Sequence, residues 1–254
     1  MTFRTAVLVV LATAVAAACA TSPTGRKQLR LVSDAEMSQM GIAAFQKLKT
    51  DTPPTRDAKV NGYVQCVAGA ITREVGGAWE VQVFESKDVN AFALPGGKIG
   101  VYTGLLKVTA NQDQLAAVIG HEVSHVLAGH SASRVSNEMA AQLGVSVLAS
   151  ATGMSADMIG MGANLLLLLP YSRGDESEAD ILGQQLMARA GFDPAEAARL
   201  WVNMQRANGG APPEFLSTHP SASTRIQDLN NNLARVQPLY EQARAAGKKP
   251  SCTP

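Results

Sequence analysis

The sequence has little charge and few aromatic residues, which make up 17% and 5% of its 254 residues. Its 22 basic and 21 acidic residues are almost balanced, and they form no run of one sign. Proteins that bind nucleic acid usually concentrate basic residues on one face, so no nucleic-acid partner is expected. Because Ala, Leu and Gly are abundant instead, the composition favours closely packed helices.

Long apolar runs are also scarce, and the run at the N-terminus is short. Ala6–Val15 is an apolar run of about ten residues behind Arg4, whereas a membrane-spanning helix needs about 20. Such a run is typical of an export signal, so residues 1–18 are predicted to be a signal peptide. Ala16–Ala18 allow two outcomes: ordinary cleavage, or lipid attachment to Cys19, although a lipoprotein signal usually has Leu three residues before its cysteine.

Cysteine is rare, since the chain has only Cys19, Cys66 and Cys252. An odd number in an exported protein leaves one thiol to explain. We favour lipid attachment to Cys19, which would anchor the protein to a membrane through a tether of residues 19–32. Cys66 and Cys252 would then remain as a pair that can form a disulfide in an oxidising periplasm. The alternative for this pair is two free thiols.

A second apolar stretch, residues 139–169, is longer but is interrupted by glycine and polar residues. Its one charged residue is Asp157. We favour a buried helical hairpin, because small residues permit close packing, and a membrane span is the alternative. The hairpin would cover the site formed by the segments on either side of it, and a gate over that site is a hypothesis.

The most informative pattern is His121-Glu122-x-x-His125, which lies among apolar residues. A helix turns about 100° per residue, so the two histidines lie roughly 40° apart on one face and can share one metal ion. Glu122 projects close to that ion without binding it, and can take a proton from a metal-bound water. The alternative is a core helix with two hydrogen-bonded histidines, so a third ligand is needed to decide.

His130 is the first candidate for the third ligand, and it does not fit. A metzincin has its third His ten residues after the first and behind a chain-reversing Gly, whereas His130 follows His121 by nine and Ala128 takes the Gly position. If the helix continues to His130, this side chain points about 140° away from His125. We interpret His130 as structural or solvent-facing.

A better candidate lies where a new helix begins. Ser172 and Asp175 fit a capping box. Glu176 and Asp180 are four residues apart and share one helix face, whereas Glu178 falls on the opposite side. Glu176 can therefore be the third ligand, with Asp180 orienting a histidine ligand from behind. The alternative is an acidic, solvated first turn, which the helix dipole favours.

Together these residues resemble a zinc metallopeptidase family that includes the CAAX prenyl proteases, the HtpX-like membrane proteases and the periplasmic LoiP-like and BepA-like lipoproteins. The resemblance covers about residues 25–236. Because no array of helical repeats follows, the chain is most similar to the LoiP-like members. The motifs, in the family's order, are Asn90–Gly97, Val101–Leu106, His121–His125, Ser172-Arg173 with Glu176-x-x-Ala179-Asp180, and Thr218-His219-Pro220 with Arg225-Ile226.

The resemblance implies a zinc-dependent endopeptidase with one Zn²⁺ per chain. His121, His125 and Glu176 would hold the metal and leave a fourth position for water. Glu122 would be the catalytic base, and Asp180 would orient a ligand from the second shell. The resemblance also implies a periplasmic protein, anchored by its lipid to the inner face of the outer membrane.

The resemblance further implies how a substrate binds. Asn90, Ala91, Phe92 and Ala93 would form an edge strand that pairs with an extended peptide through its backbone. The alternative is an ordinary hairpin packed on the core. Arg225 would approach the same cleft and contribute to substrate binding.

His219 is assigned a catalytic role by the same resemblance, because it could donate a hydrogen bond to the oxyanion of the transition state. Its alternative is a surface loop histidine. The implied substrates are unfolded or misfolded envelope polypeptides, which would make this a quality-control protease. The rival function is a chaperone or assembly factor for outer-membrane proteins, in contact with the assembly machinery and with little or gated proteolysis.

The expected fold is α+β and mostly helical: a zincin-like (gluzincin) domain with a small sheet beside the helix of His121. A single metallopeptidase domain would span residues 33–240, between the tether and a flexible tail of residues 241–254. A break of the last helix is expected near Pro238. Helices are expected over residues 33–49, 56–74, 112–127, 176–190, 194–207 and 221–240, and strands over residues 79–84, 90–94 and 98–102.

Overall fold

A computed structural model describes residues 19–143, 162, 166, 170–206, 214–219 and 224–254. The predicted signal peptide and most of the predicted hairpin of residues 139–169 lie outside the described residues. In chain order the elements are β1 (Cys19–Thr21), β2 (Lys27–Leu29), α2 (Asp34–Asp51), α3 (Ala58–Arg73), β3 (Glu80–Phe84), β4 (Ala91–Leu94), β5 (Lys98–Tyr102), a 3₁₀ turn (Leu105–Lys107), α4 (Gln112–Leu127), α5 (His130–Leu143), α8 (Arg173–Arg189), α9 (Glu196–Arg206), α10 (Glu214–Thr218) and α11 (Thr224–Ala245).

Short-range hydrogen bonds fix where the helices begin. Ser33 caps α2 by accepting from the backbone of Glu36, whose carboxylate accepts from the backbone of Ser33 in return. Ser172 and Asp175 form the same capping box at the start of α8. Asn111 caps α4 by accepting from the Gln114 backbone. These caps need only residues three apart, which is why the sequence predicts these helix starts.

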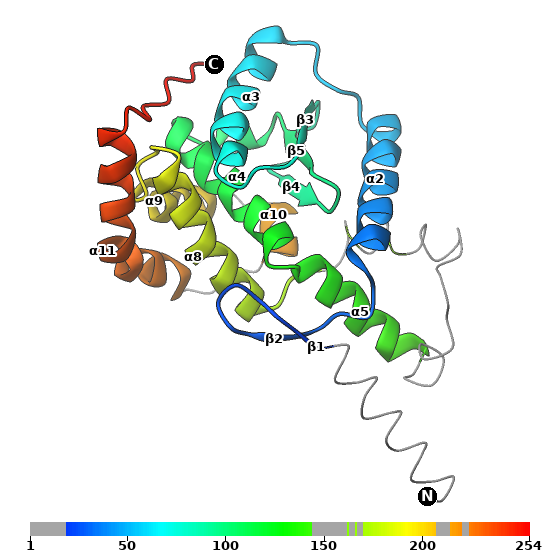
Figure 1. Cartoon of the computed structure of the whole chain (residues 1–254). Coiled ribbons are helices and arrows are strands. Elements are labelled where there is room, and N and C mark those ends of the chain that lie inside the picture. The colour runs from blue at the N-terminus through cyan, green and yellow to red at the C-terminus, as the bar shows by residue number, and fades with distance from the viewer. Residues whose placement is uncertain (1–18, 144–161, 163–165, 167–169, 207–213, 220–223) are drawn as a thin grey trace, which may run out of the picture.

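A three-stranded sheet lies beside α4, with strand order β3-β5-β4. Strand β5 pairs in parallel with β3 and antiparallel with β4, so β4 is an edge strand. Alternate residues of the sheet face two different cores. Ala93 belongs to the core with α3 and α4, whereas Phe84 and Leu94 pack against α2 and α5. The expected α+β, mostly helical fold with a small sheet is confirmed (Figure 1).

Helices α4 and α8 approach each other closely through glycine. A Cβ atom added to Gly120 would lie 2.9 Å from the carbonyl oxygen of Gly183, and one added to Gly183 would lie 2.7 Å from the backbone nitrogen of His121. Neither position has room for a side chain. The contact sets the first turns of α8 against the metal-binding face of α4.

The C-terminal segment differs from the expected flexible tail. Helix α11 continues past Pro238 to Ala245, so the expected break is also absent. Beyond it, Lys248 bonds to Glu74, and Cys252 is buried and joined to Cys66 by a disulfide. The disulfide is one of the two outcomes that the cysteine count allowed, and the structure shows it formed. Together with Lys248 it fixes the segment against α3, which the polar composition of the segment did not indicate.

The predicted tether also differs from the structure. Cys19–Thr21 and Lys27–Leu29 pair as an antiparallel hairpin instead of forming a loose linker. We call residues 19–29 the N-terminal hairpin. It lies next to α5 and the start of α8 (Figure 1), with Cys19 exposed. Among the helices of the described residues, none combines the length and apolar character that crossing a membrane requires.

Candidate metal centre

Helix α4 places the three residues of its His-Glu-x-x-His pattern in the interior. His121, Glu122 and His125 are buried, with no more than 4% of each exposed. The Nε2 atoms of the two histidines lie 3.0 Å apart, on the side of α4 that faces α8. The structure therefore brings both predicted ligands to one point, as one helical turn between them requires.

Two further side chains complete the group. Glu176, in the first turn of α8, has its carboxylate oxygens 3.5 Å from His121 Nε2 and 3.5 Å from His125 Nε2. His219, just after α10, places Nδ1 at 3.0 Å from Glu176 and 3.3 Å from His121 Nε2. One ligand atom from each of the four residues lies within 4.8 Å of the others. The sequence predicts three ligands, and the structure offers a fourth.

The chemistry of this group fits zinc. Imidazole nitrogen and carboxylate oxygen are among the donors that zinc takes, in a set of four. Burial lowers the pKa of His125 and the neighbouring His121 and His219 lower it further, which keeps His125 in the neutral, metal-binding form. Burial opposes ionisation of Glu176, but the attraction of His219 and hydrogen bonds from His121 and His219 hold its pKa below the ordinary range.

Glu122 is held beside this group without belonging to it. Its Oε2 accepts a hydrogen bond of 3.3 Å from the backbone of Ala93 on β4. Its Oε1 is buried and has no hydrogen-bond partner among the described residues, with His219 Nε2 at 3.4 Å. Burial raises the pKa of Glu122 despite the opposing charges of His219 and His121. A carboxylate with a raised pKa and one oxygen without a hydrogen-bond donor is suited to accept a proton.

His121 is supported directly by a carboxylate. Its Nδ1 lies 3.1 Å from Asp180 Oδ1, so Asp180 contacts a histidine that it is predicted to orient. Arg225 donates to both oxygens of Asp180 and, with Nη1, to Glu176. The hydrogen bonds to Asp180 and Glu176 raise the pKa of His121 to about 9, against the effect of burial.

The predicted role of Arg225 in substrate binding stays a prediction, and the contacts of Arg225 in the structure are with the metal-binding group itself. Its side chain is 2% exposed and lies against the Trp201 ring, with the guanidinium 3.7 Å from the ring centroid. All its charge is directed at the two carboxylates of the site, Glu176 and Asp180. Two buried carboxylates require a buried cation, and Arg225 is that cation.

His125 is supported by residues that the sequence analysis did not assign. Its Nδ1 lies 2.9 Å from Nδ1 of His130, whose Nε2 lies 3.2 Å from Glu178. His130 is fully buried, so the solvent-facing alternative is wrong. Helix α4 ends before it: Gly129 has φ +68°, and this turn brings His130 back over His125. The glycine before His130 is the feature of the sequence that could have predicted the end of the helix at this point.

Aromatic rings enclose the group. Tyr171 stacks on the His125 ring with centroids 3.8 Å apart, and Phe215 stacks on the His219 ring at 4.4 Å. Tyr171 directly precedes the capping box of α8, but no pattern in the sequence identifies it as part of the site. These contacts restrict rotation of both imidazoles.

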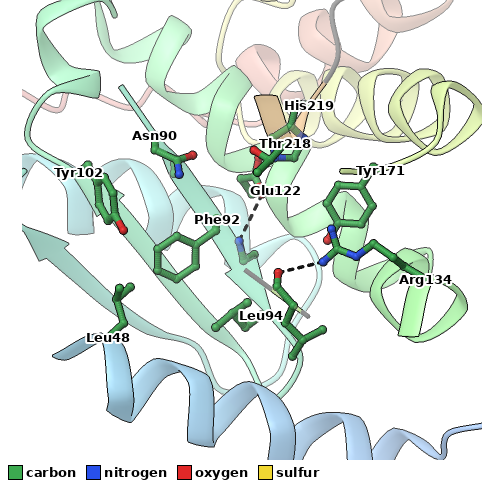
Figure 2. A pocket seen from close by; sticks show the side chains of 13 residues that line it. Leu48, Asn90, Phe92, Leu94, Tyr102, Glu122, Arg134, Tyr171, Thr218 and His219 are labelled. Carbon is green, nitrogen blue, oxygen red and sulfur yellow. Dashed lines mark hydrogen bonds and ion pairs between the residues drawn. The ribbon is translucent and has the colours of Figure 1, made fainter. Parts of the chain in front are cut away.

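A cavity of about 210 Å³ lies next to Glu122 and runs along β4 (Figure 2). The predicted substrate-binding strand, Asn90, Ala91, Phe92 and Ala93, lines it. Asn90 also has a buried Oδ1 with no partner among the described residues. The other walls of the cavity come from α2, the end of β4, β5, α5, residue 166 and the residues around α8 and α10: Leu48, Leu94, Tyr102, Arg134, Leu166, Tyr171, Thr218 and His219.

The model of peptidase family M48 matches residues 54–233 of the chain. This match covers both helices of the metal centre, the three-stranded sheet and the first ten residues of α11.

Curated relatives agree with this match. The mitochondrial metalloendopeptidase OMA1 of Schizosaccharomyces pombe is 40% identical over 161 residues, 63% of this chain and 48% of its own length. The mitochondrial metalloendopeptidase OMA1 of Bos taurus is 30% identical over 242 residues, 85% of this chain and 45% of its own. The beta-barrel assembly-enhancing protease of Escherichia coli K12 is 26% identical over 220 residues, 81% of this chain and 45% of its own. The chain thus spans about half the length of the curated relatives it matches.

Proposed function

This chain belongs to peptidase family M48, and from that premise we propose that it is a zinc-dependent endopeptidase of the bacterial cell envelope. Its substrates would be unfolded or misassembled proteins. The observation that carries the proposal is Glu122: a buried carboxylate beside the metal ligands, with one oxygen fixed on β4 and the other open. A structural zinc site does not need a carboxylate that can accept a proton beside its ligands.

Each residue of the site has its own role in peptide hydrolysis. His121, His125 and Glu176 would hold zinc, which when bound polarises a peptide carbonyl and lowers the pKa of a water molecule to about 7. Glu122 would accept a proton from the water molecule that attacks the peptide and would later deliver a proton to the leaving amine. Asp180 keeps His121 in the tautomer that presents Nε2 to the metal.

The substrate would bind as an extended strand along β4. Because β4 is the edge of the sheet, its outer backbone groups are available to a peptide. Ala93 is tied to Glu122 by a hydrogen bond, so a peptide paired here would pass the catalytic carboxylate. The apolar side chains Leu48, Phe92 and Leu94 favour a substrate with a bulky apolar residue next to the cleaved bond.

The proposed cellular place rests on the three cysteines of the chain. Cys19 is exposed at the start of β1, where a lipid would leave the folded domain unobstructed. The disulfide between Cys66 and Cys252 is compatible with an oxidising compartment such as the periplasm. Together they support a lipoprotein of the LoiP-like kind on the periplasmic side of the outer membrane.

A gated enzyme that assists outer-membrane assembly is the second candidate. His219 favours it, because four protein ligands are typical of a closed zinc site, whereas a catalytic site keeps one position open. A His219→Ala variant separates the roles. If His219 blocks the fourth position, the variant cleaves faster than wild type; if His219 donates to the oxyanion, the rate falls by about 100-fold to 1,000-fold.

The direct test of the proposed function is cleavage of casein by the wild-type chain and by a Glu122→Gln variant. Both should bind about one zinc per chain, and the variant should cleave at least about 100-fold more slowly because it cannot take the proton. Glu241→Gln, an exposed change on α11, is the matched control and should retain full activity. Zinc in both proteins with cleavage in neither would favour the gated or assembly role, and no zinc in either would refute the metallopeptidase.

A further inference from the structure

The N-terminal hairpin is connected to the metal centre by an unbroken series of hydrogen bonds. We propose that this hairpin is a working part of the metal centre: through Glu178 and His130 it orients His125 for metal binding. The inference rests on the same metal site as the proposed function, but it concerns metal affinity and not the reaction. None of the residues between the hairpin and His125 would touch the substrate.

The first step of the series is fixed by the chemistry of imidazole. His125 presents Nε2 to the other ligands, so its Nδ1 must carry the proton. This proton can be donated only if the facing nitrogen, Nδ1 of His130 at 2.9 Å, is an acceptor. His130 must then carry its own proton on Nε2, which points at the Glu178 carboxylate 3.2 Å away. The direction of every bond is thereby determined.

The second step holds the Glu178 carboxylate in place. Its Oε1 accepts from the backbone and the hydroxyl of Thr24, at 3.1 and 2.7 Å. Its Oε2 accepts from Arg26 Nη1 at 3.0 Å, and the same nitrogen lies 2.8 Å from Asp175. Three of these donor groups belong to the turn of the N-terminal hairpin. His130 is the partner of Glu178 that does not belong to the hairpin.

The hairpin is itself fixed to the domain, which allows it to transmit position. Ser22 and Arg26 close its turn by a backbone bond of 2.8 Å, and the Ser22 hydroxyl accepts from the Arg26 backbone. Beyond β2, the backbone of Leu31 donates to Ser136 on α5. The turn therefore has one position relative to α5 and α8, and Glu178 is held accordingly.

The same arrangement has a consequence for the two ends of the series. Arg26 is partly exposed, with 36% of its side chain accessible, whereas His125 is fully buried. A change at the surface can therefore alter a ligand in the interior. Displacement of the hairpin would remove Thr24 and Arg26 together, so the buried Glu178 carboxylate would lose two donors at Oε1 and one at Oε2.

The test is the zinc affinity of the full chain, measured by competition with a chelator of known affinity. Glu178→Gln should weaken zinc binding about 10-fold to 100-fold, as for other residues that orient a ligand from behind. Arg26→Ala should weaken it in the same direction by about threefold or more, and Arg26→Lys, which keeps a charged donor, should restore part of the loss. Lys27→Ala is the matched control: it removes the same charge from the neighbouring residue, whose contact is an exposed bond to Thr21.

The thermal unfolding of the metal-free proteins is measured alongside, so that a loss of fold is not taken for a loss of orientation. The proposal predicts weaker zinc binding in Arg26→Ala with unfolding temperatures of the metal-free proteins close to those of Lys27→Ala. Equal zinc affinity in wild type, Glu178→Gln and Arg26→Ala would overturn it. Failure of the proposed function appears differently, as tight zinc binding without cleavage of casein, and leaves this result unaffected.

Discussion

The two histidine ligands of α4 lie one turn apart, yet they are supported in different ways. His121 donates directly to Asp180, and Arg225 holds that carboxylate from α11. We call these residues the inner support. Each of its residues has at most 6% of its surface exposed, so it belongs to the core of the domain.

His125 reaches a carboxylate only through a second histidine, His130, and then Glu178. Thr24 and Arg26 hold Glu178 from the N-terminal hairpin, and we call this series the outer support. Both supports end in a carboxylate paired with an arginine. The inner arginine is buried and the outer one is partly exposed. We therefore expect the loss of the inner arginine to lower the free energy of unfolding more than the loss of the outer one.

The comparison is tested most strongly by removing each arginine in turn. Arg225→Ala leaves Glu176 and Asp180 as buried carboxylates with an uncompensated charge, and should lower the free energy of unfolding by about 3–5 kcal/mol. Arg26→Ala removes a partly exposed ion pair and should cost about 0–1 kcal/mol. Urea unfolding of the metal-free proteins measures both. Similar losses in the two variants would mean that burial does not separate the supports.

The disulfide offers a second test, because it fixes the segment that follows the helix of the inner support. Cys66 and Cys252 are separated by 186 residues along the chain. A Cys66→Ser, Cys252→Ser double variant should lose about 2–4 kcal/mol of unfolding free energy, since the unfolded chain gains freedom. Cys19→Ser is the control, because Cys19 is free and exposed. A double variant as stable as this control would show that α11 does not depend on the disulfide.

The loss of zinc affinity on removing each carboxylate compares how much the two supports contribute to metal binding. Asp180→Asn should weaken zinc binding about 10-fold to 100-fold, because Asp180 touches the ligand His121 itself. The loss should exceed that of Glu178→Gln, which acts on His125 through one more residue. Asp228→Asn, an exposed change on α11, should leave zinc affinity unchanged. A larger loss from Glu178→Gln would reverse the ranking of the two supports.

The smallest expected effect is a pH dependence of the outer support. Burial opposes ionisation of Glu178, but hydrogen bonds from Ser22, Thr24 and His130 lower its pKa from 4.5 to about 2. A lowered pKa means that the carboxylate stabilises the fold above about pH 4.5 and loses this contribution as the pH falls toward about 2.

Unfolding free energies at about pH 6 and pH 3 check this dependence in wild type and Glu178→Gln. The difference between the two proteins should be larger at pH 6 and should shrink at pH 3, because the wild-type carboxyl becomes protonated on unfolding there. A difference that stays constant over this range would show that Glu178 has an ordinary pKa.

Much of the inner support could be predicted from the sequence, because its geometry is local. His121 and His125 share a face at a spacing of four, and so do Glu176 and Asp180. The spacing of residues could not predict which groups Arg225 contacts. The resemblance implied that Arg225 binds substrate, and only the packing of α11 against Trp201 shows that Arg225 neutralises buried carboxylates.

The outer support could not be predicted, because it depends on a turn and on residues 149 to 154 positions apart. A continued helix would carry His130 away from His125, whereas the turn at Gly129 brings it back. Glu178 lies away from the ligand face of α8, and its partners come from a hairpin that the sequence presents as a polar linker.

The sequence by itself determined the longer helices, the three-stranded sheet and the ligands that share an element, because capping bonds, helical periodicity and strand alternation act over three or four residues. It did not predict β1, β2, α5 or α10. The tertiary structure alone decided which distant side chains meet. It placed His219 among the ligands, Arg225 against the carboxylates and the N-terminal hairpin behind His125. These contacts follow from how the helices pack, and packing is a property of the whole chain and not of any local pattern.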